Sequence, residues 1–291
     1  MNTENEIDKL IKETQSNDPA KTTSDIYAFI EKHRTVVVRN FKGYVKYFED
    51  YFDVLNNAIS SLNFVPKENW SQYKSLQYLM FPETLKTLHR AFEDTVAGYY
   101  EEAVILLRTV YETYIKMIFI ACYPEDFEAI FRNRKQKRNF NLTNFVKDDL
   151  HFDWEFIYRF MSYASHSKIH LILERLIKLS KKEDKNPIRL EYKYDKDAIS
   201  RPMNLSTFLL YVLLNIMLVT FKDDLENSKI DRNHIIRIVK IDKVLRGILE
   251  SLPNKFSSIV KDIDRIDIIL ECAKQGKDWK NIQINNLAKQ D

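Results

Sequence analysis

The sequence predicts an all-α protein, a multi-helix bundle, and two observations carry this prediction. Only four glycines occur among 291 residues, whereas strand-rich and nucleotide-binding folds need glycine for tight turns and for close approach of the backbone to phosphate. Apolar residues also recur at steps of three and four along most of the chain, which is the spacing of amphipathic helices. The glycines are too far apart to build a GxGxxG or GxxxxGK loop, so a Rossmann or P-loop enzyme is not expected.

The composition indicates a soluble globular protein, with 45% apolar and 30% charged residues. A net charge of +3 is too small for the whole chain to attract nucleic acid. The first residues lack an apolar signal core, and Cys122 and Cys272 lie far apart in apolar contexts, so we expect reduced thiols and a cytoplasmic location. The predicted division is a polar N-terminal segment at 1–25, a helical core at 26–226 and a C-terminal helical appendage at 227–291.

The first half of the chain predicts a succession of helices. Residues 1–25 are polar and are expected to be frayed or weakly helical. Apolar residues at helical spacing over 26–55 predict one long amphipathic helix. Pro82 is expected to start a new helix at its first turn, and that helix should end near Gly98. The strongly apolar stretch 99–124 predicts an interior helix.

The second half begins with a predicted loop with short helices at 125–150, followed by a helix at 153–179. Alternating apolar and charged residues suggest a small extended segment near 188–195. The uncharged stretch 205–221 approaches the length of about 20 residues that a membrane span needs. Its polar residues and the charges that follow at once favour a central helix buried on all sides, with no membrane contact.

A polar cluster interrupts the apolar pattern of the helix predicted at 153–179. At about 100° per residue, Arg159 and His166 share one helix face, with Ser162 between them. A histidine can transfer a proton near neutral pH, and an arginine fork can hold phosphate oxygens, so this face suits phosphodiester chemistry. The alternative is a purely structural helix, whose polar side chains find hydrogen-bond partners at the edge of the core.

Arg108 and Glu112 form a second polar pair, four residues apart in the interior helix at 99–124. Because a buried charge needs a partner, each is expected to pair with the other. The pair is either a structural ion pair or part of the same centre as His166. We therefore expect Arg108, Glu112, Ser162 and His166 to lie in one neighbourhood.

Metal binding is a rival interpretation of the two histidines, because His166 and His170 are four residues apart, as zinc ligands on a helix are. No glutamate follows His166 directly, and Glu174 is the only acid nearby on the C-terminal side, so neither a metal nor another cofactor is expected. A separate basic run could contact a phosphate backbone. It contains Arg132, Arg134, Lys135, Lys137 and Arg138.

Two stretches of the sequence carry separate motifs. "AVILLRTVYETYIKMIFI" carries Leu-Leu-Arg-x-x-x-Glu, and "DWEFIYRFMSYASH" carries Trp, Tyr and then Ser-x-x-x-His. Together they resemble an uncharacterised bacterial all-helical family allied to the HEPN superfamily. The resemblance covers roughly residues 75–225. HEPN proteins are helical bundles, often dimeric, and many are metal-independent endoribonucleases of toxin–antitoxin, CRISPR and phage-defence systems.

The resemblance implies roles for individual residues. The HEPN signature is Arg, four to six residues, then His, which Arg159 and His166 match with six residues between them. Arg159 would hold the scissile phosphate and His166 would transfer a proton, leaving a cyclic phosphate. Phe160 follows the arginine where HEPN nucleases usually carry a polar residue. Arg108, Glu112 and Ser162 would converge on the same site.

Two hypotheses about function follow. The first is a HEPN-like cytoplasmic endoribonuclease or toxin of phage defence, acting on RNA as a homodimer, with an antitoxin or another defence-system protein as its partner. The second is a non-catalytic helical binding or regulatory subunit of such a system. A nuclease needs Arg159 and His166 to reach solvent in one cleft, whereas a binding module would bury or scatter them.

Overall fold

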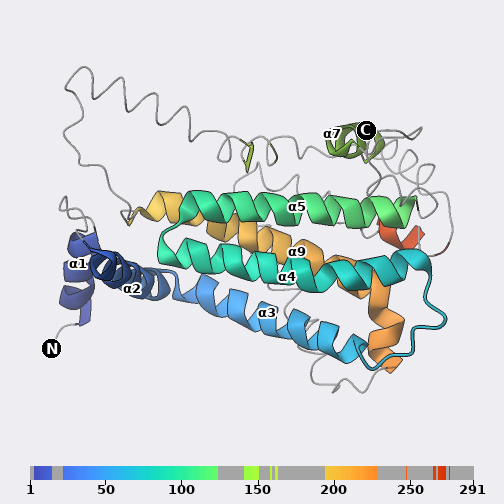
Figure 1. The fold of residues 1–291 in the computed structure, drawn as a ribbon, viewed down its shortest axis with the longest axis horizontal. Coiled ribbons are helices and arrows are strands. Elements are labelled where there is room, and N and C mark those ends of the chain that lie inside the picture. The colour runs from blue at the N-terminus through green and yellow to red at the C-terminus, as the bar shows by residue number, and fades with distance from the viewer. Residues whose placement is uncertain are drawn as a thin grey trace.

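The fold is that of a computed structural model, which describes residues 3–14, 22–123, 141–150, 158, 161–162, 194–227, 247, 265–266, 268–272 and 275. Within these ranges the chain is helical and contains no strand, which confirms the predicted all-α class. The long helices α3, α4, α5 and α9 lie along the length of the molecule, and α1 and α2 stand at one end (Figure 1). Residues 188–193 of the predicted extended segment lie outside the described ranges, and Tyr194 and Asp195 directly precede α9.

The N-terminal part differs from the prediction of one long helix. Helix α1 spans Thr3–Thr14 and packs against α2, which spans Thr23–Asn40. Helix α3 then spans Lys42–Leu62, because the backbone leaves the helical conformation at Phe41 (φ −115°, ψ 27°). The prediction of an unbroken helix was wrong because Phe41 is buried and keeps the apolar spacing intact across the corner.

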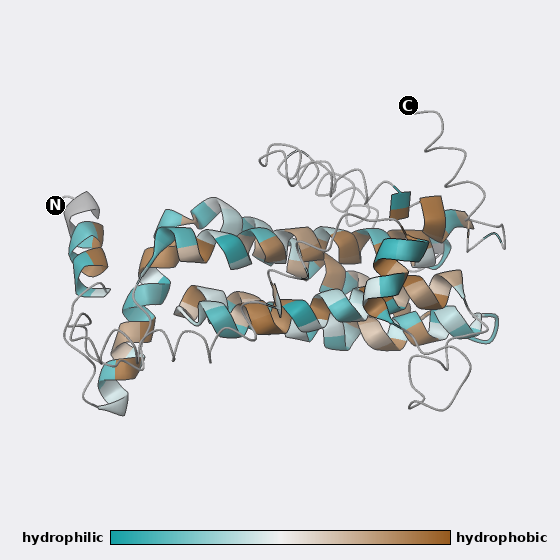
Figure 2. Cartoon of the chain, turned by 90° about the horizontal axis from the view of Figure 1, so that it is seen from above, coloured by the Kyte–Doolittle hydropathy of each residue, from teal (hydrophilic) through white to brown (hydrophobic). Residues whose placement is uncertain are grey.

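Capping and amphipathicity explain where these helices start and how they pack. Thr22 and Asp25 form a reciprocal capping box at the start of α2, which satisfies two backbone N–H groups. Apolar residues recur along each helix with polar residues between them, as a helix with one buried face and one exposed face requires (Figure 2). The helices therefore associate through apolar faces that each sequence segment carries on one side.

Helix α4 spans Gln72–Ala97 and contains Pro82 in its interior, so the prediction that Pro82 starts a helix was wrong. The start lies one residue after Ser71, whose hydroxyl accepts a hydrogen bond from the backbone N–H of Lys74. A proline inside a helix costs about 3 kcal/mol. Burial of the neighbouring apolar side chains, among them Phe81 and Leu85, offsets this cost.

The turn between α4 and α5 is closed by Gly98, as the sequence predicts. Gly98 has φ of 96°, which suits glycine, and its N–H donates to the carbonyl of Thr95. The N–H of Tyr99 donates back to the carbonyl of Asp94 at 2.7 Å, which completes a Schellman motif. Helix α5 then spans Tyr100–Cys122, in agreement with the predicted interior helix, and packs extensively against α4.

Short elements follow at the far end of α5. Helix α7 spans Leu142–Asn144 and continues as a π-helical turn, η2, over Phe145–Asp149, where short helices were expected. Arg265 donates a hydrogen bond to the carbonyl of Leu150 at 3.0 Å. Ile266, Ile269 and Leu270 are buried in the same apolar core as the long helices, so this part of the C-terminal segment covers the bundle.

Helix α9 is the central helix and spans Lys196–Asn227. It starts earlier than the predicted 205, because the carboxylate of Asp195 accepts hydrogen bonds from the N–H groups of Asp197 and Ala198, and because Pro202 is tolerated inside the helix. In the described part of the chain it alone is long and apolar enough to cross a membrane, yet 78% of its most apolar window is buried inside the protein. That burial is compatible with a soluble protein.

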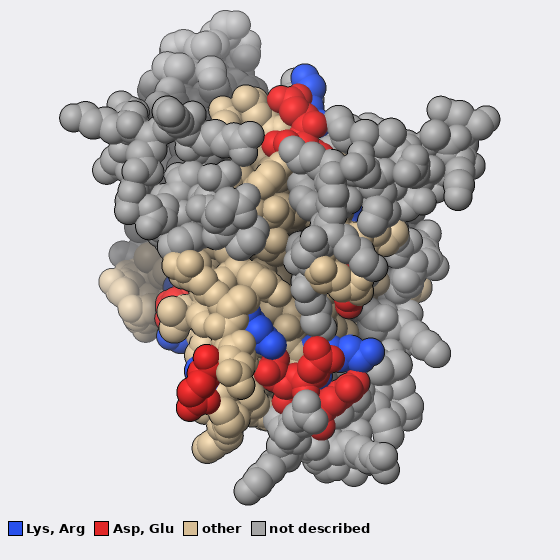
Figure 3. All heavy atoms as spheres, turned by 90° about the vertical axis from the view of Figure 1, so that its right-hand side faces the viewer, with Lys and Arg blue, Asp and Glu red and all other residues tan. Residues whose placement is uncertain are grey.

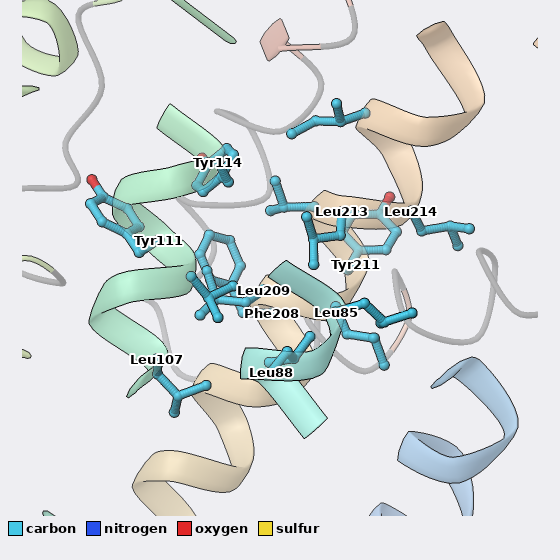
Figure 4. Packing of buried hydrophobic residues seen from close by; sticks show 14 of the residues in the cluster. Leu85, Leu88, Leu107, Tyr111, Tyr114, Phe208, Leu209, Tyr211, Leu213 and Leu214 are labelled. Atoms are coloured by element: carbon cyan, nitrogen blue, oxygen red, sulfur yellow. The ribbon is translucent and has the colours of Figure 1, made fainter. Parts of the chain in front are cut away.

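The core forms where α9 meets α4 and α5. Phe208 and Leu209 of α9 face Leu85 and Leu88 of α4 and Leu107 of α5 (Figure 4), and all five are almost fully buried. Burial of a leucine or phenylalanine side chain contributes roughly 1.5–3 kcal/mol. This three-helix contact is therefore the main apolar support of the fold.

One buried polar connection crosses this apolar region. The side-chain amide of Gln77 on α4 donates to the carbonyl of Met117 on α5 at 3.0 Å. The hydroxyl of Thr220 on α9 donates to the Oε1 atom of Gln77 at 2.6 Å. Gln77 thereby satisfies polar groups on two other helices and fixes the position of three helices relative to one another.

A second buried connection holds α2 to the α4–α5 turn and to the start of α9. His33 is fully buried, and its Nδ1 donates to the carbonyl of Val96 at 3.0 Å, so Nε2 accepts from the hydroxyl of Tyr100 at 2.5 Å. The His33 ring also lies 5.8 Å from the ring of Tyr194, which precedes α9 by two residues. Burial lowers the pKa of His33 below its ordinary value, despite the opposing effect of the Val96 carbonyl.

The opposite end of the bundle is closed by a mixed cluster of charged and aromatic residues. The indole N–H of Trp70 donates to Asp224 at 3.0 Å, and the ammonium group of Lys74 pairs with the same carboxylate and lies over the Trp70 ring. On this face lysines and arginines lie beside aspartates and glutamates (Figure 3). Asp224 thus attaches the last turns of α9 to the start of α4.

Replacement of Gln77 by methionine is expected to lower the free energy of unfolding by about 1–3 kcal/mol, because the Thr220 hydroxyl loses its buried acceptor. Adding Thr220→Val should recover part of the loss. Urea unfolding measures both effects, and Gln72→Met, on an exposed position of the same helix, is the matched control. Equal small effects of Gln77→Met and Gln72→Met would contradict the role of the buried amide.

Lowering the pH from about 8 to about 5 is expected to destabilise the protein through His33. The unfolded chain takes up a proton near the ordinary pKa of about 6.5, whereas the folded chain does so only at lower pH. The contribution of His33 is therefore complete above about pH 6.5 and is lost as the pH falls from there through the folded-state pKa, by at most about 1.4 kcal/mol per pH unit.

Urea unfolding at a series of pH values measures this dependence. His33→Gln should flatten it, whereas His89→Gln, at an exposed position, should retain it. The same slope in the wild type and in His33→Gln would assign the pH dependence to other groups.

Candidate functional site

Arg108 and Glu112 form the predicted pair on α5. The Nε atom of Arg108 donates to Glu112 Oε1 at 2.8 Å, one helical turn away. Their side chains are 22% and 31% exposed, so the pair lies at the edge of the core and is more open than an interior helix suggested. A partly exposed pair of this kind retains access to solvent and to a ligand.

Tyr158 joins this pair from a separate segment of the chain. The Nη2 atom of Arg108 donates to the Tyr158 hydroxyl at 2.9 Å, and the guanidinium carbon lies 5.0 Å from the centre of the Tyr158 ring. This distance is within the range of a cation–π interaction. The contact brings α5 against the segment that carries Tyr158, as the predicted convergence requires.

The neighbours of Arg108 favour its charged form. Burial by itself would lower the pKa of the guanidinium, but hydrogen bonds to Glu112 and Tyr158 and the Glu112 charge outweigh it, so the pKa is raised. Arginine is charged under all ordinary conditions. The site therefore contains a permanent cation whose orientation is set by a carboxylate on one side and a phenol on the other.

Ser162 lies one helical turn after Tyr158. Tyr158, Met161 and Ser162 are each in helical conformation, and the rest of the helix predicted at 153–179 lies outside the described residues. Met161 is fully buried in the core, whereas Tyr158 and Ser162 are half-buried. Ser162 is four residues after Tyr158 in sequence, a spacing that puts two side chains on one face of a continuous helix.

The remaining predicted site residues lie outside the described ranges. They are Arg159, His166, His170 and Glu174 of the predicted helix, and Arg132, Arg134, Lys135, Lys137 and Arg138 of the basic run. The convergence of Arg108, Glu112 and Ser162 with His166 stays a prediction. Among the residues that the structure does describe, no group of three His, Cys, Asp or Glu side chains could hold a metal ion.

Tyr158 was not selected as a site residue from the sequence. The sequence did offer a signal, because Tyr158 is the tyrosine of the Trp, Tyr, Ser-x-x-x-His stretch, directly before Arg159 and four residues before Ser162. A tyrosine among apolar residues is usually interpreted as part of the core. The ring of Tyr158 does pack on the core, since it lies 6.3 Å from the ring of the buried Tyr111. Only the fold shows that its hydroxyl meets Arg108.

The fold and the site define the protein as an all-α bundle with a half-buried cluster of Arg108, Glu112 and Tyr158 on the edge of one long helix. No family model, curated protein or solved structure matches the chain. The predicted relationship to HEPN proteins therefore stays a prediction.

Glu112→Gln is expected to lower the free energy of unfolding by less than about 1 kcal/mol, because partly exposed ion pairs contribute little to stability. Glu83→Gln, which removes the partner of Lys86 in an exposed pair on α4, is the matched control. Thermal or urea unfolding checks the result. A loss above about 3 kcal/mol, as for a buried pair, would contradict the edge position of Glu112.

Proposed function

We propose that this protein is a HEPN-like, metal-independent endoribonuclease that acts as a toxin in defence against phage. The observation that carries the proposal is the contact between Arg108 and Tyr158. It joins the Leu-Leu-Arg-x-x-x-Glu helix to the segment that contains Arg159 and Ser162, which are the two segments on which the resemblance rests.

The proposed mechanism uses side chains alone. Arg159 holds the scissile phosphate and stabilises the charge that develops on its oxygens. His166 removes the proton of the ribose 2′-hydroxyl or delivers one to the departing 5′-oxygen. Attack of the 2′-oxygen on phosphorus breaks the bond to the 5′-oxygen and leaves a 2′,3′-cyclic phosphate. In this proposal Arg108, whose pKa is raised by Glu112 and Tyr158, contributes a fixed positive charge to this centre.

The proposal includes an assembly and a location. HEPN-like proteins commonly dimerise around their Arg–His faces, so two copies would share one groove through a self-complementary interface. The basic run Arg132 to Arg138 would line that groove and attract the RNA backbone. A cytoplasmic location is part of the proposal, and the burial of α9 is compatible with the soluble protein that it requires. An antitoxin or another defence-system protein would control the activity.

A non-catalytic binding or regulatory subunit is the second candidate, and one observation favours it. Arg108 is hydrogen-bonded to both Glu112 and Tyr158, as expected for a structural tie between helices. In that case the polar cluster serves only to hold the two segments together. A protein that is strictly monomeric in solution would also favour this candidate over the shared groove.

Incubation of the purified protein with total RNA in the presence of EDTA tests the proposed function. We expect cleavage that leaves cyclic phosphate ends and that falls by about 10²-fold or more in His166→Ala, because general acid–base catalysis contributes about 10²–10⁴-fold. His89→Ala is the control for loss of an exposed histidine elsewhere.

Three outcomes are decisive. Cleavage that survives in His166→Ala would overturn the mechanism. Cleavage that disappears with EDTA and returns with added metal would overturn metal independence. Absence of cleavage by the wild type and its binding to RNA or to a partner protein would support the second candidate.

A further inference from the structure

We infer that Tyr158 is a positioning residue, which holds the guanidinium of Arg108 in one orientation so that its positive charge assists the proposed cleavage of RNA. This inference rests on the proposed function. It assigns to Tyr158 a role that acts through Arg108 and not through contact with the substrate. The contacts of both residues carry it.

The first step is the restraint on Arg108. Its side chain is long and flexible, and Glu112 restrains it only from the next turn of the same helix, at the Nε atom. Tyr158 restrains it from another segment, by accepting a hydrogen bond from Nη2 and by offering its ring face. The guanidinium plane is fixed when it is held at two different nitrogens from two directions.

The second step is the rigidity of Tyr158 itself. Its ring lies 6.3 Å from the ring of Tyr111, which is fully buried and makes an edge contact with Tyr114 at 5.6 Å. Tyr111 extends from the side of α5 that faces away from α9 in this view (Figure 4). The Tyr158 ring is thus held against the core. Its hydrogen bond to Arg108 therefore restrains the guanidinium relative to the core.

The third step is the place of Tyr158 in the chain. It directly precedes Arg159 and lies one turn before Ser162. The contact of Tyr158 with Arg108 therefore joins a cation on α5 to the residue that directly precedes the proposed phosphate-binding arginine. Misplacement of a catalytic group by about 1 Å can reduce a rate by about 10²-fold, so loss of this contact should be visible in catalysis.

The experiment compares cleavage kinetics in four proteins. Tyr158→Phe removes the hydroxyl and keeps the ring, and Tyr158→Leu removes both. Tyr123→Phe is the matched control, because Tyr123 is also half-buried and its hydroxyl donates to a charged side chain, Asp149, at 3.1 Å. With a defined RNA, we expect kcat to fall by about tenfold in Tyr158→Phe and further in Tyr158→Leu, with KM within about twofold of the wild type.

A double-mutant cycle supplies a readout that needs no activity. Tyr158→Phe and Arg108→Met are combined, and the unfolding equilibrium constant is measured in urea for all four members of the cycle. The two substitutions should be coupled by about threefold or more, since a hydrogen bond to a charged group joins the two residues.

The outcomes separate this inference from the proposed function. A wild type that cleaves RNA, with Tyr158→Phe no slower than Tyr123→Phe, would overturn the positioning role and leave the nuclease intact. An effect on KM alone would also overturn it, because it would make Tyr158 a substrate contact. A wild type that does not cleave RNA would overturn the proposed function and, with it, any role of Tyr158 in cleavage. Absence of coupling in the cycle would show that the phenol does not hold Arg108.

Discussion

The side-chain amide of Gln77 is the interaction on which the arrangement of the long helices depends. Apolar contacts between α4, α5 and α9 supply most of the stabilisation, but they are non-directional and tolerate sliding and rotation. Gln77 bonds to Met117 on one helix and to Thr220 on another, in a region where water cannot replace either partner. A shift of any of the three helices would leave a buried polar group unsatisfied, so the amide selects one register among many apolar packings.

That register determines which residues of α5 remain at the edge of the core. With Tyr111 and Tyr114 buried, Arg108 and Glu112 are partly exposed, and Arg108 contacts Tyr158. The cluster is therefore a consequence of the same packing that buries α9. Its guanidinium is held by Glu112 and by Tyr158 at two different nitrogens, which restricts the orientations that the side chain can adopt.

The sequence predicted the class of fold because apolar spacing and scarce glycine are local properties. It also predicted the Gly98 turn, the interior helix after it and the Arg108–Glu112 pair, which all depend on neighbours in sequence. It failed at Pro82, where tertiary packing outweighs a local preference, at the start of α9, which lies at Lys196 and not near 205, and at Phe41, where the apolar spacing continues through a corner. Tyr158 was missed because its bond to Arg108 joins residues fifty positions apart.

The long separation of α9 from its partners affects how the chain is made. Helices α4 and α5 are joined by the tight turn at Gly98 and can pair as soon as both have left the ribosome, because their contacts are local. Helix α9 is synthesised only after a further stretch that starts at Tyr123 and ends at Asp195. During that interval the apolar faces of α4 and α5 that later cover α9 are open to water, and a nascent chain in this state is exposed to aggregation and to chaperones. Packing of α9 ends this period, since α9 supplies the missing apolar surface. It also supplies the Thr220 hydroxyl, which donates a hydrogen bond to Gln77.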